Sequence, residues 1–355
     1  MKNVLVVGFG LAGICLCREL EKNSIPFECF DEGLKSTPSK VSSGLINPIT
    51  GRRFQLAWNY LQLFQVFEPF YRDLEERCGT RFVTQIDIIH PFTSAEIQNN
   101  FAISALDPLH EDYLSVNYKV HKWPISEDFG IIKNGFRLDL RKLIDAYSKL
   151  LIDSNLLNIE KFDYEQLKIE DNILKYKNGD YSHVVFCEGA KITSNPFFNN
   201  IPMVPAKGEV LIIEVEGLDE TMILKKDLYF MRIGPNIYWV GSNYQWDFED
   251  SMPTASRQDE FYQRIIAVLP DFKVKVLDHW AAIRPTSHDR KPYIGRHKIH
   301  GNMMVINGLG TRGCSLSPFL AQEAARLILQ NDYIVDRDIN LERGVEFAKK
   351  RAQKT

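Results

Sequence analysis

The N-terminal residues best suited to chemistry match the pattern GxGxxG, and they are Gly8, Phe9, Gly10, Leu11, Ala12 and Gly13. In this pattern the first glycine permits a tight turn, and the second lets the backbone approach a pyrophosphate. The third lets a helix pack closely against a strand. The free N–H groups at the start of that helix attract phosphate. The pattern therefore predicts a dinucleotide-binding turn, although it does not separate NAD from FAD.

The elements that must position this turn surround it in the required order. An apolar run at Val4–Val7 predicts a buried parallel strand, and Ile14–Lys22 has helical periodicity. A second strand is predicted at Phe27–Phe30, and it leads into Asp31 and Glu32. Asp31 comes 18 residues after Gly13, where a carboxylate accepts hydrogen bonds from a ribose diol. The alternative, a glycine-rich turn in an α/β unit without a ligand, is less favoured because the full context is present.

The chain after Asp31 favours FAD over a nicotinamide cofactor. A doubly wound nicotinamide domain would continue with strand–helix repeats, whereas here a polar segment, 36–43, is followed by the segment 44–53. Gly44 and Gly51 in that second segment suit close approach of the backbone to a ring system. An ordinary surface loop is the alternative interpretation.

Two later strands also lead into turns of small residues. The segment 181–190 predicts a buried strand and turn, and a hairpin is expected before it, from 162 to about 178. Near the C-terminus, the apolar strand Met303–Ile306 leads into a glycine-rich turn and then a helix, expected from Phe319 to Leu329. A glycine-rich turn at a helix start suits an anion, here the pyrimidine edge of a reduced flavin.

These motifs together resemble the D-amino-acid-oxidase-type (DAO) family of FAD-dependent oxidoreductases. The family includes glycine oxidase, sarcosine oxidase, D-amino-acid dehydrogenase and the oxidase half of a bacterial enzyme that matures a tRNA wobble uridine. The resemblance spans nearly the whole chain in the family's order. It rests on the N-terminal fingerprint and on the segments SSGLINP, VVFCEGA, PAKGEV, AAIRPTSHDRKPYIG and NGLGTRGCSLSPFLAQEAARLI.

The resemblance implies an α/β fold with a Rossmann-like FAD-binding domain and an inserted substrate domain of α+β type built on an antiparallel sheet. We expect the FAD-binding domain to be discontinuous, at residues 1–75, 137–200 and 277–355. The substrate domain then takes residues 76–136 and 201–276.

The resemblance also implies which residues bind FAD. Residues 8–13 would contact the pyrophosphate, Asp31 the adenosine ribose, and Phe162 the adenine through its backbone. Glu32, next to Asp31, is also expected to bind the cofactor. Three further groups would follow the ribityl chain and flavin, the diphosphate, and the pyrimidine edge of the flavin. In this order they are Ser42, Ser43, Gly44, Leu45 and Ile46; Cys187, Glu188 and Gly189; and Gly308, Leu309, Gly310, Thr311, Arg312 and Gly313. Sarcosine oxidases tether their flavin through a cysteine near the position of Ala282, so we expect the FAD here to be non-covalent.

Four residues are candidates for handling the substrate. Arg284 occupies the position where several family members hold a substrate carboxylate, and arginine binds a carboxylate through two donors. The alternative is a structural ion pair, for example with Asp289. Arg312 is a second candidate, in a register that resembles the tRNA-modifying oxidase. Tyr229 and Tyr244 lie on a predicted sheet that would cover the substrate, although aromatic residues in a sheet are more often core.

Composition limits the remaining possibilities. The 355 residues are 45% hydrophobic and carry a net charge of 43 − 46 = −3, which excludes wholesale disorder. No apolar stretch reaches about 18 residues, so no membrane span is expected. The charge argues against a nucleic-acid partner held by phosphate contacts but leaves one open. The six cysteines show no metal or disulfide pattern, which predicts a cytoplasmic protein without a metal.

Three functions are consistent with the sequence. The favoured one is an FAD-dependent oxidase or dehydrogenase that oxidises a C–N bond of a small amino acid or secondary amine by hydride transfer to flavin N5. The second is oxidation of a carboxymethylaminomethyl group on a tRNA wobble uridine. The third is a flavin-binding protein without turnover. The sequence does not show which amine is the substrate, or whether oxygen or a quinone accepts the electrons.

Overall fold

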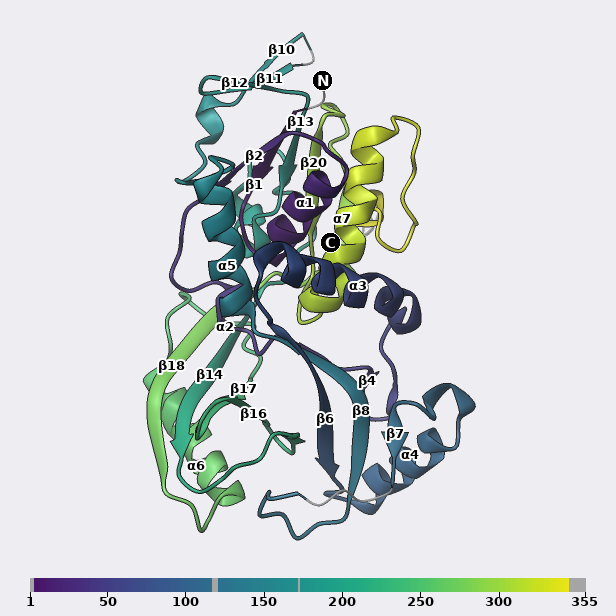
Figure 1. Ribbon diagram of the computed structural model, residues 1–355, viewed down its shortest axis with the longest axis vertical. Helices are drawn as coiled ribbons and strands as arrows, with labels where there is room; N and C mark the ends of the chain where they lie inside the picture. Colours follow the sequence, from purple (N-terminus) through teal and green to yellow (C-terminus); the bar gives the residue numbers. More distant parts are fainter. Residues whose placement is uncertain (1–2, 117–120, 172, 345–355) are drawn as a thin grey trace, which may run out of the picture.

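The structure is a computed structural model, and it describes residues 3–116, 121–171 and 173–344. Two sheets dominate it (Figure 1), a six-stranded sheet in the upper half and a nine-stranded sheet in the lower half. The six-stranded sheet has the order β19 (Tyr293–Arg296), β20 (Met303–Asn307), β13 (His183–Phe186), β1 (Val4–Val7), β2 (Phe27–Asp31) and β9 (Leu157–Ile159).

Strand β1 lies inside the six-stranded sheet because all four of its side chains are apolar and buried. It pairs in parallel with β2 and β13, and β13 pairs in parallel with β20. Val4 and Val6 face a core that is shared with the helices α1 (Leu11–Lys22), α3 (Tyr60–Cys78), α5 (Leu140–Asp153) and α7 (Gly313–Leu329). Leu5 and Val7 face a second core, which includes the aromatic residue Phe186. A parallel sheet covered on both faces needs this continuous apolar pattern.

The nine-stranded sheet is mainly antiparallel. Its order is β18 (Val274–Arg284), β14 (Ala206–Val215), β17 (Ile237–Gly241), β16 (Tyr229–Gly234), β15 (Ile223–Lys225), β6 (Val83–Pro91), β8 (Phe129–Leu138) and β3 (Leu45–Ile46), with β7 (Leu114–Ser115) on β8. Alternate residues of β14 face opposite sides. Leu211 and Ile213 pack with helix α6 (Ala255–Val268), whereas Val210 and Ile212 pack with the segment that contains Ile49.

Shorter elements complete the fold. They are the helices α2 (Pro38–Val41) and α4 (Ala95–Ala105), the 3-10 turns η1 (Pro108–His110), η2 (Tyr164–Gln166) and η3 (Gly189–Ser194), the hairpin β4 (Ile49–Thr50) with β5 (Gln55–Leu56), and a small antiparallel sheet of β10 (Lys168–Glu170), β11 (Ile173–Tyr176) and β12 (Gly179–Tyr181). The hairpin expected up to residue 178 is therefore a three-stranded sheet, because the chain turns twice. Within the described residues, no helix is both long and apolar enough to cross a membrane.

Two strands cross the domain divisions expected from the sequence. The division at 277 falls inside β18, which pairs with β14 from Val274 to Arg284. The division at 137 falls one residue before the end of β8. Leu45 and Ile46, expected in the FAD-binding domain, pair with β8 at the edge of the nine-stranded sheet. The two units therefore share strands where they meet, and residues from both lie side by side there.

Helix α7 begins at Gly313, six residues before the expected start at Phe319. The predicted start at Phe319 was wrong, because Pro318 lies inside the helix. A proline inside a helix leaves the carbonyl four residues earlier, here that of Cys314, without its N–H donor. The hydroxyl of Tyr71 on α3 donates to this carbonyl at 2.8 Å. A side chain from another helix thus satisfies the carbonyl and allows α7 to start at the glycine turn.

Candidate active site

The turn between β1 and α1 is built by close backbone contacts at its glycines. Gly8 has φ +98°, and a Cβ there would lie 2.5 Å from the carbonyl oxygen of Cys187. A Cβ on Gly13 would lie 1.9 Å from the carbonyl oxygen of Gly8. Both positions therefore require glycine, whereas Gly10 has only the Ser39 hydroxyl near its Cβ position, at 3.4 Å. The roles expected for Gly8 and Gly13 match this geometry.

Asp31 is held at the end of β2 by the backbone of this turn. One carboxylate oxygen accepts from the N–H of Phe9 at 2.7 Å, and the other accepts from the N–H of Gly33 at 2.8 Å. A carboxylate has about four acceptor positions, so both oxygens keep capacity for a ribose diol. Glu32 next to it instead forms an ion pair with Lys191.

A residue that sequence reasoning missed lies at the start of α1. The Ser39 hydroxyl on α2 accepts from the N–H of Leu11 at 3.0 Å. The prediction named Ser42 and Ser43 instead, and their hydroxyls accept from the N–H groups of Gly44 and Leu45 at 3.2 and 3.3 Å. Both of those serines thus shape their own loop, while Ser39 lies where helix α1 offers its free N–H groups. The cluster of serines in 36–43 was the signal, but it did not show which serine reaches the helix.

Gly44 brings the loop before β3 against the end of β8. It has φ +72°, and a Cβ there would lie 1.9 Å from the carbonyl oxygen of Leu138. The carbonyl of Gly44 also accepts from the N–H of Leu138 at 2.9 Å. This contact fixes Leu45 and Ile46 where the six-stranded and nine-stranded sheets meet. By contrast, a Cβ on Gly51 would meet nothing within 4 Å among the described residues, so its approach to a ring system stays a prediction.

The turn after β13 shows which residues bind the Glu188 side chain, which the sequence did not. The Glu188 carboxylate accepts from the hydroxyl of Tyr164 and from the side-chain amide of Asn195, the latter at 2.7 Å. Burial raises the pKa of this carboxyl above its usual range, and the two hydrogen bonds oppose that shift. Cys187 is buried, and burial raises the pKa of its thiol. The ring of Phe162 stacks on Tyr176 at 4.3 Å in the core, which leaves its backbone for any role at the adenine.

The turn after β20 joins the other two glycine turns. The side chain of Asn307 donates to the carbonyl of Gly189 at 2.9 Å and accepts from the N–H of Gly308 at 2.8 Å. The N–H of Gly310 donates to the carbonyl of Pro285 at 3.0 Å. Gly308 and Gly310 both have positive φ, +74° and +56°. This turn ends at Gly313, where α7 begins, so a second helix N-terminus faces the same region.

These three turns together fit an extended dinucleotide cofactor. They follow β1, β13 and β20, which are neighbouring parallel strands, so their carboxyl ends meet at one edge of the sheet. The buried hydroxyl of Thr286 has no hydrogen-bond partner within the described part of the chain, and it lies 3.8 Å from the Cβ position of Gly310.

Arg284 lies at the end of β18 and reaches across Gly208 on β14. A Cβ on Gly208 would lie 2.0 Å from a guanidinium nitrogen of Arg284, so the arginine occupies space that glycine leaves. The guanidinium donates to the hydroxyl of Ser242 at 2.7 Å and to the carbonyl of Asn243 at 3.0 Å. Burial lowers its pKa.

Arg284 has no carboxylate partner among the described residues. Asp289, the structural partner considered from the sequence, instead accepts from Arg343 at 2.8 Å. The interpretation of Arg284 as half of an Arg284–Asp289 ion pair is therefore wrong. A buried guanidinium held only by neutral groups keeps its full positive charge available to an anion.

Tyr244 packs against Arg284, and Tyr229 lies near Tyr244. The guanidinium carbon of Arg284 is 4.5 Å from the centre of the Tyr244 ring, and Tyr244 is 54% exposed. Burial raises the pKa of Tyr229 to about 12, the nearby Tyr244 raises it further, and a hydrogen bond with Asn47 opposes this shift. The structure thus links Arg284 to Tyr244, Tyr244 to Tyr229 and Tyr229 to Asn47, which sequence reasoning placed only within the GLINP segment.

Arg312 has a different set of partners. It directly precedes α7, and its guanidinium donates to the carbonyl of Arg290 and lies 5.6 Å from the centre of the Trp58 ring. Burial and the nearby charge of Arg290 lower its pKa. Whether Arg312 handles the substrate therefore stays a prediction.

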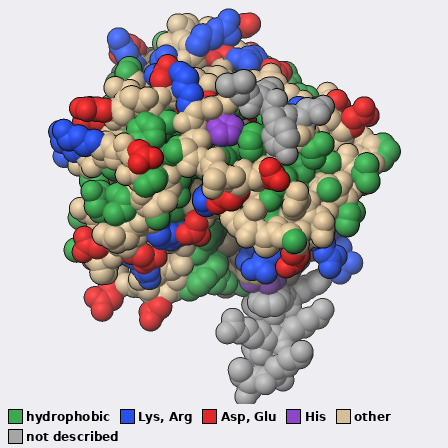
Figure 2. All heavy atoms as spheres, turned by 90° about the horizontal axis from the view of Figure 1, so that it is seen from below, with side chains coloured by type: hydrophobic (Ala, Val, Ile, Leu, Met, Phe, Trp, Pro, Cys, Tyr) green, Lys and Arg blue, Asp and Glu red, His purple; other side chains and the backbone are tan. Residues whose placement is uncertain are grey.

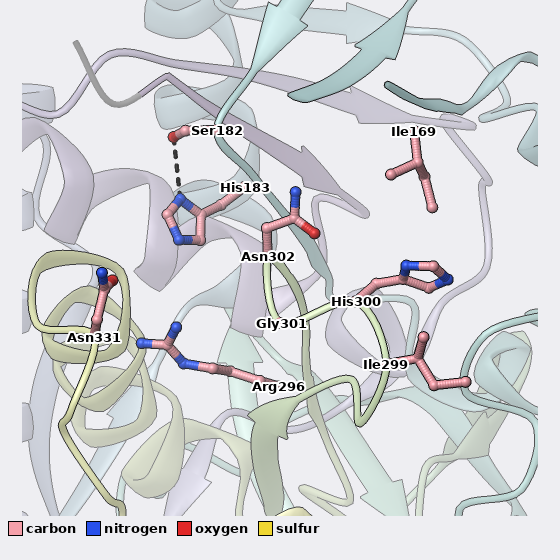
Figure 3. A pocket seen from close by; sticks show the side chains of 9 residues that line it. All are labelled: Ile169, Ser182, His183, Arg296, Ile299, His300, Gly301, Asn302 and Asn331. Carbon is pink, nitrogen blue, oxygen red and sulfur yellow. Dashed lines mark hydrogen bonds between the residues drawn. The ribbon is translucent and has the colours of Figure 1, made fainter. Parts of the chain in front are cut away.

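A cavity of about 310 Å³ lies away from all of these residues (Figure 3). It is lined by Ile169, Ser182, His183, Arg296, Ile299, His300, Gly301, Asn302 and Asn331. None of them is a predicted site residue. Arg296 donates to the carbonyl of Gln330 at 3.0 Å and also to that of Leu327 at the end of α7. This arginine therefore caps a helix, and the cavity adds nothing to the site.

The fold and the glycine turns define a dinucleotide-binding oxidoreductase. A model of the family of FAD dependent oxidoreductases (DAO) matches residues 3–327, so this chain belongs to that family. The predicted family, the predicted α/β fold class with a Rossmann-like FAD domain, and FAD as the cofactor are all confirmed.

Relatives of known name support the same family. The glycine oxidase of Pseudomonas putida is 28% identical over 138 residues, and the match covers 38% of each protein. The chain thus matches less than half the length of this relative. The bifunctional protein MnmC of tRNA 5-methylaminomethyl-2-thiouridine biosynthesis, from Idiomarina loihiensis, is 27% identical over 343 residues, which cover 91% of this chain and 55% of MnmC.

Solved structures show the likeness of the fold. The glycine oxidase of Geobacillus kaustophilus superimposes with a TM-score of 0.75 at 18% identity, covering 95% of this chain and 97% of that one. The iminodiacetate oxidase of Chelativorans sp. BNC1 gives a TM-score of 0.74 at 18% identity, covering 95% and 98%. This likeness extends over both sheets and not only over the FAD-binding half.

Proposed function

We propose that this flavoprotein oxidises a C–N bond of a small amino acid or secondary amine. The observation that carries the proposal is Arg284, a largely buried guanidinium that has no carboxylate partner among the described residues and packs against Tyr244. A substrate carboxylate would supply the missing negative charge, and the planar guanidinium suits two parallel hydrogen bonds to it.

The FAD is proposed to lie along the three glycine turns. Asp31 would accept from the adenosine ribose, the turn at Gly8–Gly13 and the N-terminus of α1 would contact the diphosphate, and the turn at 308–313 would face the pyrimidine edge of the flavin. When bound, the flavin supplies the acceptor, at N5, for the hydride equivalent that leaves the carbon next to nitrogen. We expect this FAD to be non-covalent, since the position that carries the tether in sarcosine oxidases is Ala282.

The protein's own side chains then have positioning roles. Arg284 would fix the carboxylate and thereby the adjacent C–H bond. With a pKa of about 12, Tyr229 keeps its proton at neutral pH, so it acts as a hydrogen-bond donor and not as a base. Tyr244 would cover the carboxylate, because its ring already lies against the guanidinium. We propose that the six-stranded unit binds FAD and that the nine-stranded sheet binds the substrate. We also propose a cytoplasmic location, because the six cysteines are free thiols and disulfides are rare in reducing compartments.

The first experiment is an anaerobic visible spectrum of the purified protein before and after substrate. Glycine, sarcosine, iminodiacetate, D-amino acids and N-methyl amines are added as a pool and then separately. A flavin band that bleaches with one of the carboxylated amines supports the proposal. Reoxidation with oxygen or with a soluble quinone then identifies the acceptor. A bound flavin that none of these compounds bleaches contradicts the small-amine proposal and favours either an RNA-borne substrate or a flavoprotein without turnover.

An RNA-borne substrate is the second candidate because of two specific observations. The match to MnmC covers 91% of this chain. In addition, the rings of Tyr244 and Trp246 stack 6.0 Å apart beside Arg284, and both are about half exposed, as a platform for a nucleobase would be. The net charge of −3 and the mixed acidic and basic side chains on the face in Figure 2 favour the small amine. Flavin bleaching by tRNA that carries the carboxymethylaminomethyl group would reverse this order.

A further inference from the structure

A short strap covers Arg284 and provides its partners. We define the strap as residues 242–254, which connect the end of β17 at Gly241 to the start of α6 at Ala255. It carries Ser242 and Asn243, which accept hydrogen bonds from Arg284, and Tyr244, which packs against the guanidinium. The strap is therefore part of the surroundings of Arg284 although it belongs to no strand or helix.

Both ends of the strap are fixed to β14. Near its start, Gln245 and Lys207 exchange two backbone hydrogen bonds, of 2.9 and 3.0 Å. At its end, the fully buried carboxylate of Glu209 accepts from the N–H and the hydroxyl of Thr254, both at 2.9 Å. A loop fixed at both ends holds its side chains in place before any ligand arrives, which lowers the entropy cost of binding.

A hydrogen bond from the backbone of β14 determines the orientation of the Asn243 side-chain amide. Its oxygen, Oδ1, accepts from the N–H of Glu209 at 2.8 Å. Because a backbone N–H can only donate, this bond fixes which end of the amide is oxygen and which is nitrogen. The nitrogen, Nδ2, is buried and has no hydrogen-bond partner within the described part of the chain. Burying an unpaired amide donor costs free energy that the bond to Oδ1 does not recover.

We propose that Asn243 is a second carboxylate-binding residue, whose Nδ2 donates to the same substrate carboxylate as Arg284. This inference rests on the proposed function. The positive charge of Arg284 attracts the carboxylate, and the neutral donor of Asn243 completes its hydrogen bonding. The strap thus selects amines with a carboxylate next to the reacting carbon over simple amines.

Titration with benzoate tests this proposal without turnover. Benzoate carries a carboxylate and no oxidisable amine, and its binding is followed through the flavin absorption band of the FAD-loaded protein. In Asn243→Ser the amide donor is lost without a new charge, and we expect the Kd to rise about tenfold. Asn243→Asp keeps an oxygen that accepts from the backbone N–H of Glu209 and replaces the Nδ2 donor with a negatively charged oxygen. We expect the Kd for benzoate to rise about a hundredfold in this variant. Asn199→Asp makes the same change at an exposed site and should leave the Kd unchanged.

The outcomes separate this inference from the proposed function. If Arg284→Gln weakens benzoate binding strongly while Asn243→Ser leaves it unchanged, Asn243 does not bind the carboxylate and the inference is wrong, whatever Asn243→Asp does. If Arg284→Gln itself has no effect, the carboxylate does not bind at Arg284 and the proposed function fails first. A melting temperature measured for each variant excludes a general loss of structure, since Asn243→Asp keeps the bond to Glu209.

Discussion

The proposed cofactor end and the proposed substrate end of this molecule are built in different ways. The cofactor end consists of backbone turns at the ends of β1, β13 and β20, where the main requirement is that certain residues lack a side chain. The substrate end depends on side chains that come from distant parts of the sequence, such as Asn47, Tyr229 and Arg284. A local pattern can therefore specify the first region, while only the fold specifies the second.

The largest effect is expected from a methyl group at the cofactor end. In Gly13→Ala the new Cβ would lie 1.9 Å from the carbonyl oxygen of Gly8, so α1 must move away from β1. We expect a loss of at least about 3 kcal/mol of stability and purification without FAD. Gly301→Ala is the matched control, because a Cβ there meets nothing within 4 Å. Visible spectra and melting curves measure both effects. If Gly13→Ala kept its flavin, the glycine turn would not be the cofactor site.

A smaller effect is expected at the strap of the substrate end. The buried Glu209 carboxylate lies 3.6 Å from the ammonium group of Lys207 and 2.9 Å from Nε2 of His279. Glu209→Gln removes the charge that compensates the buried Lys207, and we expect a loss of about 2 kcal/mol of unfolding free energy, with FAD retained. Glu214→Gln on the same strand should cost little, since its ion pair with Lys275 is exposed. Equal losses for the two variants in urea titrations would contradict this role of Glu209.

The hydrogen bond from the Tyr71 hydroxyl to the Cys314 carbonyl in the first turn of α7 is expected to contribute about 1 kcal/mol to the free energy of unfolding. Tyr71→Phe removes the donor to the Cys314 carbonyl, which Pro318 leaves without an N–H. A second change, Pro318→Ala, restores that N–H. We therefore expect Tyr71→Phe to cost much less in the Pro318→Ala background than in the natural chain. A double-mutant cycle measured by urea unfolding checks this, and strictly additive losses would show that the hydroxyl does not replace the missing donor.

The smallest effect concerns pH at the turn after β13. Burial raises the pKa of the Glu188 carboxyl in the folded protein. A raised pKa means that its contribution to stability is full at low pH and is lost as the pH rises through the folded-state pKa. Glu188→Gln removes this titration, so its melting temperature should fall less between pH 4 and pH 8 than that of the natural protein, by on the order of 2 °C. Parallel melting curves for the two proteins would argue against the raised pKa.

The sequence predicted the strands, turns and helix of the proposed cofactor end because their determinants are local. The GxGxxG turn, Asp31 and the late glycine turn each depend on a few consecutive residues and on the order of strand, turn and helix. The two features that the sequence missed depend on contacts between elements that are distant in the sequence. Ser39 reaches the start of α1 only because α2 folds back onto it, and the early start of α7 depends on a hydroxyl from α3.

The substrate end was predicted only in part. Arg284, Tyr229 and Tyr244 were named from the resemblance and the alternation of strands, and the structure places Tyr244 against Arg284 and near Tyr229. Asn243 was missed because nothing in its neighbours shows that its oxygen is used by β14 and its nitrogen is left free. The sequence also could not exclude the pairing of Arg284 with Asp289, since that depends on Arg343, which lies 54 residues after Asp289.

The most direct test of the central claim compares flavin reduction in the natural protein and in Arg284→Gln. Both proteins are mixed anaerobically with the carboxylated amine that bleaches the flavin most rapidly. We expect Arg284→Gln to retain FAD and to lose about a thousandfold in the second-order rate of bleaching, because the carboxylate then lacks its charged partner. Arg264→Gln on α6, which removes partly exposed ion pairs with Asp227 and Glu260, should bleach at the natural rate. Bleaching of Arg284→Gln at the natural rate would contradict the account.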